Sequence, residues 1–129
     1  MEELKARYGV QPVEPGHPGY LKLLDEMRLL HQKKAADYGR DADPLANLRA
    51  SIEVGIEPWR ATWLRAMDKV TRINTYCQKG TLANESVEDS FMDLAAYALI
   101  GLILYREEQI RRQLELENDG LRAALEKPI

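Results

Sequence analysis

The segment ESVEDSFMDLAAYALIGLILY, residues 85 to 105, constrains the fold more than any other part of the chain. Ser86 followed three residues later by Asp89 resembles a helix-capping box with aspartate in place of the usual glutamate. From Phe91 to Tyr105 a helix would be apolar on nearly every side, which is typical of a buried helix. Its longest apolar run, residues 94 to 105, falls short of the about 20 residues that span a bilayer. The segment therefore predicts a core helix and no membrane span.

The length of the chain limits how that core helix can be covered. A chain of 129 residues suits one domain. One layer of neighbouring helices would not cover a helix that is apolar on nearly every side. We therefore expect a second subunit to cover the remainder, in a homodimer or a homotetramer.

Terminus signals divide the rest of the chain into helices. A helical apolar period starts at Tyr20 and ends near residue 38, and Asp43-Pro44 opens a short helix that Gly55 closes. Pro58 opens a long helix that ends before Gly80. Its apolar stripe is expected to be buried and consists of Trp63, Ala66, Val70, Ile73 and Cys77.

These signals predict three segments and an all-α fold. Residues 1–19 form an extended arm rich in proline and glycine, residues 20–105 form a helical core, and residues 106–129 form a charged amphipathic extension and tail. We expect the last helix to stop at Gly120. Because no alternating strand pattern is visible, we expect an all-α helical bundle with a long C-terminal helix.

Composition excludes several classes of partner. The 18 basic and 21 acidic residues give a net charge of −3 and form no basic face, which argues against duplex nucleic acid and against a membrane surface. Cys77 is the one cysteine, so no internal disulfide can form. A reducing compartment fits this content, and we expect the cytoplasm.

Two carboxylates lie one turn apart at the start of the last helix. Asp89 and Asp93 share a helical face with Ser86 and Ser90. Like charges at this spacing repel each other unless a cation lies between them, and Mg²⁺ is the usual cation among oxygen ligands. The alternative is that Asp89 only caps the helix while Asp93 pairs with an arginine of another helix.

The helix from Pro58 carries a polar side with Asp68, Lys69 and Arg72. Taken alone, this side is a solvated face with an Asp68–Arg72 pair. Beside the two aspartates, it would add a carboxylate and cations suited to a polyphosphate. Both interpretations stay open.

The end of the first helix carries the stretch HQKKAADYG, which contains Lys34, Asp37 and Tyr38, and Asn47 follows in the short helix. An aromatic ring and an amide near a helix end could hold a nucleotide base, although turn chemistry and ordinary packing predict the same residues. The common nucleotide and hydrolase motifs, GxxxxGKS/T, GxGxxG and HExxH, are absent from the sequence. Any nucleotide site must therefore lie between helices.

Three stretches together resemble a known family. They are DYG at 37–39, RAMDKVTRI at 65–73 and ESVEDSFMDLAAYALIGL at 85–102. They resemble the nucleotide-modification-associated domain of bacteriophages and bacteria, a relative of the MazG-like all-α NTP pyrophosphohydrolases. The resemblance covers about residues 20 to 105.

The resemblance implies a fold, the MazG-like helical bundle, and an activity. MazG-like enzymes are helical dimers or tetramers that cleave nucleoside triphosphates to a monophosphate and pyrophosphate with Mg²⁺, for which Mn²⁺ could substitute. Asp93 matches the aspartate of their ExxD motif, whereas Ser90 stands in the place of the glutamate, so that Asp89 would substitute. Around Asp68, one acid stands where their EExxE helix has three, and Glu85 is a candidate further ligand.

We therefore expect a Mg²⁺-dependent nucleoside or deoxynucleoside triphosphate pyrophosphohydrolase, within phage nucleotide metabolism. The expected metal ligands are Asp93, Asp89, Asp68 and Glu85. The expected substrate-binding residues are Lys69, Arg72, Lys34, Asp37, Tyr38 and Asn47. The alternative is a non-catalytic helical oligomer of the same fold that binds a nucleotide or a protein.

Overall fold

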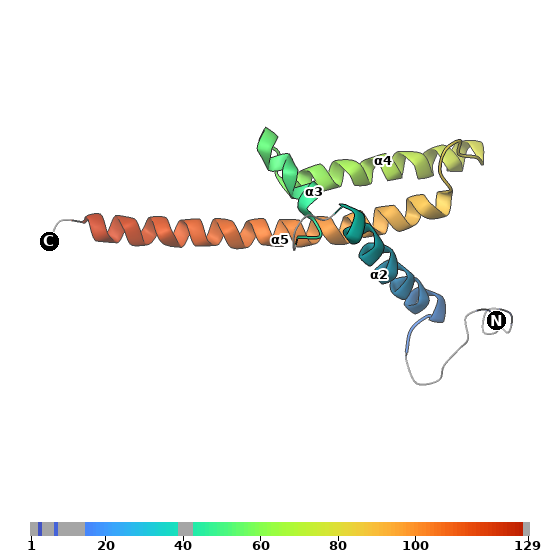
Figure 1. The fold of residues 1–129 in the computed structure, drawn as a ribbon, viewed down its shortest axis with the longest axis horizontal. Coiled ribbons are helices and arrows are strands. Elements are labelled where there is room, and N and C mark those ends of the chain that lie inside the picture. Colours follow the sequence, from blue (N-terminus) through green and yellow to red (C-terminus); the bar gives the residue numbers. More distant parts are fainter. Residues whose placement is uncertain (1–2, 4–6, 8–14, 39–42, 128–129) are drawn as a thin grey trace. The chain divides into compact units, whose positions relative to one another are not determined.

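The computed structural model describes residues 3, 7, 15–38 and 43–127. Every regular element in these residues is a helix, which confirms the all-α prediction for them (Figure 1). The elements are α2 (Pro18–Tyr38), α3 (Ala46–Arg49), the 3-10 helix η1 (Ala50–Val54), α4 (Pro58–Lys79) and α5 (Val87–Glu126). None of these helices is both long enough and apolar enough to cross a membrane. Most of the predicted arm, residues 1–19, lies outside the described residues.

The chain divides into two units, residues 1–47 and residues 48–129. The first unit contains α2, and at its start the Gly19 N–H donates to His17 Nδ1 at 3.0 Å. The second unit contains η1, α4 and α5. The short helix predicted between Asp43 and Gly55 forms as α3 followed by η1, and Gly55 ends it with a left-handed φ of 77°. Local signals thus predicted this segment well.

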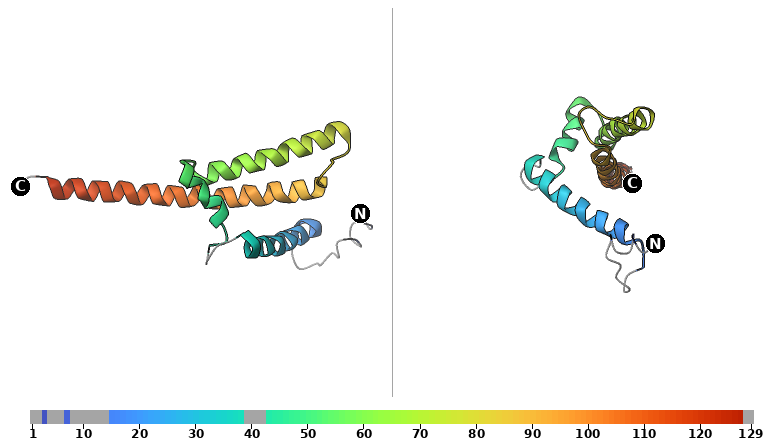
Figure 2. Two further views of the ribbon diagram at one scale, coloured as in Figure 1. Left: turned by 45° about the horizontal axis from the view of Figure 1, so that its top comes forward. Right: turned by 90° about the vertical axis from the view of Figure 1, so that its right-hand side faces the viewer.

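In the second unit, α4 and α5 form an antiparallel hairpin, which Figures 1 and 2 show from several sides. Gly80 ends α4 with a φ of 75°, a conformation that glycine adopts without a steric penalty, and its N–H donates to Tyr76 O at 2.7 Å. Ser86 begins α5, and its side chain accepts a hydrogen bond from the Asp89 N–H at 3.0 Å. Both predicted helix ends are confirmed.

Small side chains line the contact between α4 and α5. Thr62 and Ala66 on α4 and Ser90 on α5 are completely buried. At Gly101 an added Cβ would lie 3.8 Å from Thr62 Cγ2, so the two helices pass close to each other at this point. The hairpin therefore closes through a narrow strip of small residues.

This narrow contact explains why the predicted buried stripe of α4 is mostly wrong. Ala66 is buried, but Trp63 is 54% exposed and Val70 and Cys77 are also exposed. Because only small residues of α4 are completely buried against α5, the large side chains of Trp63 and Val70 remain exposed. Periodicity identified the apolar residues of α4 and did not identify which of them α5 would cover.

The predicted stop at Gly120 is also wrong, because α5 continues to Glu126. Glycine within a helix costs about 1 kcal/mol relative to alanine. The residues that follow, LRAALE, are strong helix formers and offset this cost. Every residue of α5 from Gln109 onward is exposed, and Figure 2 shows this part of α5 continuing beyond the start of α4.

Enlarging the buried Ala66 should separate the two helices. We expect Ala66→Leu to lower the free energy of unfolding by about 1–3 kcal/mol, because the added atoms overpack a contact made of small residues. Urea unfolding followed by circular dichroism measures the change. Ala123→Leu, at an exposed position of α5, is the control and should stay within about 0.5 kcal/mol. Equal effects of the two variants would contradict the described contact.

Candidate functional site

A cluster of charged side chains lies where α4 meets the start of α5. We call it the Lys69 cluster, and it consists of Lys69 and Arg72 on α4, Glu85 in the connecting loop, and Ser90 and Asp93 on α5. Lys69 Nζ lies 3.1 Å from Glu85 Oε1 and 3.1 Å from Asp93 Oδ2. Arg72 Nε lies 3.2 Å from Glu85 Oε2, and the Ser90 hydroxyl donates to the same oxygen at 3.4 Å. Two carboxylates and two cations thus converge on one point.

The centre of the Lys69 cluster is largely shielded from water. The side chains of Lys69, Glu85 and Asp93 are 17%, 18% and 15% exposed. Burial alone lowers the pKa of Lys69, but the hydrogen bonds from its ammonium group to Asp93 and Glu85, together with their negative charges, outweigh burial and raise the pKa above 10.5. The lysine is therefore protonated at neutral pH, and together with Arg72 it balances the charges of Glu85 and Asp93.

The contact with Lys69 explains why the carboxylate of Asp93 is tolerated in the apolar part of α5. A buried carboxylate is costly without a positive partner, and Lys69 on α4 supplies one. The sequence-based alternative placed an arginine of another helix in this role. An ion pair between Asp93 and another helix was therefore anticipated, but Lys69 was not anticipated as the partner.

The other predicted metal ligands have a different environment. Asp68 on α4 and Asp89 on α5 are exposed, and within the described residues neither carboxylate forms an ion pair. Ser90, in the position that the MazG-like motif gives to glutamate, is the side chain that is buried against α4. The structure thus brings Glu85 and Asp93 together and leaves Asp68 and Asp89 at the surface.

Four of the predicted substrate-binding residues belong to the first unit, whereas the Lys69 cluster belongs to the second. Lys34, Asp37 and Asn47 are exposed, and Tyr38 is the last residue of α2. The side chain of Tyr38 lies outside the described part of the structure. The contribution of these four residues to a nucleotide site stays a prediction.

The donors of the Lys69 cluster fit one kind of metal site and not another. No three His, Cys, Asp or Glu side chains in the described ranges are grouped closely enough to hold a metal ion by themselves. Mg²⁺, however, commonly binds through one or two carboxylates and completes its shell with water and substrate phosphates. Glu85 and Asp93 suit a Mg²⁺ ion that arrives with a phosphate. The Lys69 ammonium now lies between these carboxylates and would have to move.

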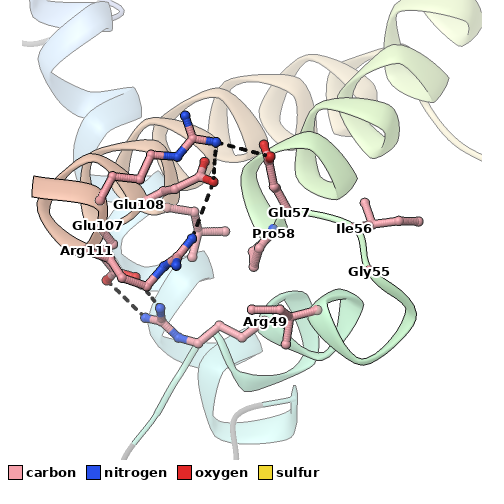
Figure 3. Close-up of a pocket in the computed structure, with 11 residues that line it drawn as sticks. Arg49, Gly55, Ile56, Glu57, Pro58, Glu107, Glu108 and Arg111 are labelled. Atoms are coloured by element: carbon pink, nitrogen blue, oxygen red, sulfur yellow. Dashed lines mark hydrogen bonds and ion pairs between the residues drawn. The ribbon is translucent and has the colours of Figure 1, made fainter. Parts of the chain in front are cut away.

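A pocket of about 490 Å³ forms a second polar region of the same unit, between η1, the start of α4 and residues 104–112 of α5 (Figure 3). Its walls combine apolar side chains with three arginines and three glutamates. The apolar residues are Ile52, Ile56, Pro58 and Leu104, and the charged residues are Arg49, Arg111, Arg112, Glu57, Glu107 and Glu108.

The charges of this pocket are balanced within the protein. Arg49 pairs with Glu107 (Figure 3). Arg112 Nη2 lies 3.4 Å from Glu57 Oε1 and 3.2 Å from Glu108 Oε1. The indole of Trp59 also donates to the buried Glu108. These contacts connect the end of α3 and the start of α4 to α5. Sequence reasoning missed them, and the only local signal was the pairing of acids and arginines in the stretch REEQIRR.

Comparison of the chain with protein-family models, with curated proteins and with solved structures finds no match. Functional inference therefore rests on the chain's own residues and on the geometry of the Lys69 cluster.

Removing the Lys69 ammonium should destabilise the hairpin at neutral pH. We expect Lys69→Met to lower the free energy of unfolding by about 1–3 kcal/mol, because Glu85 and Asp93 would lose their shared cation. Urea unfolding of the variant and of the original protein measures this difference. Lys79→Met, at an exposed position of α4, is the control and should change stability by less than about 0.5 kcal/mol.

The pH dependence of the same difference gives a second test. The folded-state pKa of Lys69 is raised, so its contribution is complete below the ordinary value of 10.5 and disappears as the pH rises through the raised value. The stability gap between the original protein and Lys69→Met should therefore narrow in strongly alkaline solution. A gap that is constant through this range would contradict the ion pairs.

Proposed function

We propose that the chain is a Mg²⁺-dependent pyrophosphohydrolase of nucleoside or deoxynucleoside triphosphates, with the Lys69 cluster as its active site. The main support is the convergence of Glu85 and Asp93 with Lys69 in one largely shielded place, with Arg72 at its more exposed edge. Two carboxylates beside two cations can bind a metal–triphosphate complex, because each kind of charge finds its opposite. The resemblance to MazG-like enzymes supports the same chemistry.

In this proposal the residues have distinct roles. Glu85 and Asp93 hold Mg²⁺, or Mn²⁺ in its place, and the exposed Asp68 and Asp89 are available as further ligands. When bound, the metal ion neutralises phosphate charge and lowers the pKa of a bound water. Lys69 exchanges its carboxylate partners for phosphate oxygens, and Arg72 binds a second phosphate through its guanidinium group.

Four residues of the first unit remain candidate substrate contacts. Lys34 is the candidate for phosphate, Tyr38 and Asn47 are the candidates for the base, and Asp37 is a further substrate-binding candidate. The resemblance also supports a homodimer or homotetramer, and the single cysteine fits action in the reducing cytoplasm. For a phage-encoded protein this is the cytoplasm of the host, and the substrates would be nucleotides of phage metabolism.

A specific observation favours a second candidate function. The Lys69 ammonium is 3.1 Å from an oxygen of each carboxylate and Arg72 pairs with Glu85, so two cations already balance the two carboxylates without a metal ion. A protein in which Lys69 never leaves this position would be a non-catalytic oligomer that binds a nucleotide or a protein. The two candidates differ in whether Lys69 exchanges partners.

Turnover assays separate the candidates. We expect the purified protein to release pyrophosphate from at least one member of a panel of NTPs and dNTPs when Mg²⁺ is present. Asp93→Asn should reduce kcat/KM by about 100-fold, because it replaces a negatively charged metal-binding carboxylate by a neutral amide. Asp119→Asn removes an exposed carboxylate of α5 and should leave turnover unchanged.

The absence of turnover would also be informative. No pyrophosphate from any nucleotide, combined with a rise in the unfolding temperature upon addition of one nucleotide, would exclude the hydrolase and support the binding protein. Turnover that is equal in Asp93→Asn and in the original protein would show that the reaction does not use the Lys69 cluster.

A further inference from the structure

Six large apolar residues of α5 repeat with a period of eleven residues. They form three pairs, each with members four residues apart, and we call them the α5 stripe: Leu99 and Ile103, Ile110 and Leu114, Leu121 and Leu125. Eleven residues make three helical turns at 3.67 residues per turn, so the stripe runs nearly straight along the helix. At 1.5 Å per residue it is about 39 Å long.

The α5 stripe is uncovered in the single chain. Its members range from 48% exposed at Ile103 to 78% exposed at Leu125. The buried residues Leu104 and Glu108 mark the face of α5 that meets α4. At 100° per residue, that face is turned by roughly 100–140° from the stripe. The hairpin partner therefore cannot cover it.

We infer that a second copy of this chain covers the α5 stripe, with the two α5 helices antiparallel about a twofold axis near Arg112. The spacing of the stripe is self-complementary, because reversing the helix about residue 112 places each stripe residue opposite another. Leu99 then faces Leu125 of the second copy, Ile103 faces Leu121, and Ile110 faces Leu114. All twelve side chains leave water together.

Charge complementarity supports the antiparallel direction and the second copy as the partner. Arg106 and Glu117 are exposed and flank the same side of the stripe. The antiparallel pair places Arg106 of each copy beside Glu117 of the other, so that two equivalent ion pairs form. Opposite charges beside an apolar contact favour this antiparallel association.

This contact goes beyond the proposed catalysis. The proposed function includes self-association, and the stripe specifies which surface makes it, but the pairing involves no residue of the Lys69 cluster. Loss of pyrophosphate release would leave the pairing intact, and loss of the pairing can be measured without any nucleotide.

Sedimentation analysis of the full chain tests the surface. We expect the original protein to associate and Leu114→Glu to weaken association by at least about tenfold, because a charge then enters the centre of the stripe. Leu116→Glu is the matched control, since Leu116 is an exposed leucine of the same helix on the side away from the stripe. It should associate like the original protein. Circular dichroism confirms that both variants fold.

Cysteine cross-linking tests the direction. In a Cys77→Ser background, a mixture of Leu99→Cys chains and Leu125→Cys chains should give mixed disulfide dimers upon oxidation. Leu125→Cys alone should cross-link poorly. A monomeric original protein, equal effects of the Leu114 and Leu116 variants, or efficient cross-linking of Leu125→Cys to itself would each overturn the antiparallel pairing.

Discussion

The ion pairs of the Lys69 ammonium group with Glu85 and Asp93 are the interactions on which the α4–α5 hairpin and its candidate site depend. The completely buried residues of the helix contact, Thr62, Ala66 and Ser90, carry little apolar surface, so they contribute little apolar stabilisation by themselves. The charged contacts add a directional requirement, because Asp93 must meet a cation to remain in the apolar helix. The same contacts also define the functional question. A lysine that can move to a phosphate leaves two carboxylates for a metal ion, whereas a lysine that cannot move makes the cluster purely structural.

Much of the fold could be predicted because its signals are local. Gly80 and Ser86 act through backbone groups within a few residues of their own positions, and the described structure confirms both helix ends. The burial pattern could not be predicted from period alone. Which face of α4 meets α5 depends on side-chain size, and a narrow strip of small residues leaves Trp63 and Cys77 exposed. Gly120 failed as a helix stop because the strong helix formers that follow it offset its cost.

The candidate site was predictable in type and only partly in membership. Because an unpaired buried carboxylate is costly, the sequence predicted a positive partner for Asp93. Lys69 and Glu85 were both among the expected site residues. The pairing itself depends on the register of two helices far apart in the sequence, which no local pattern specifies. The same limit applies to the contact between Arg112 and Glu57, which are close in space but far apart in the sequence.

The large apolar side chains that lie outside the hairpin contact are explained most directly by self-association of the chain, because exposed apolar patches of this extent usually mark interfaces.

The most direct test of the central claim is a double-mutant cycle between Lys69 and Asp93. The free energy of unfolding would be measured for the original protein, Lys69→Met, Asp93→Asn and the double variant. If the ion pair holds the hairpin together, the coupling energy should be about 1 kcal/mol or more, since residues that share a contact are not additive. Single-variant effects that add to within about 0.5 kcal/mol would contradict the claim.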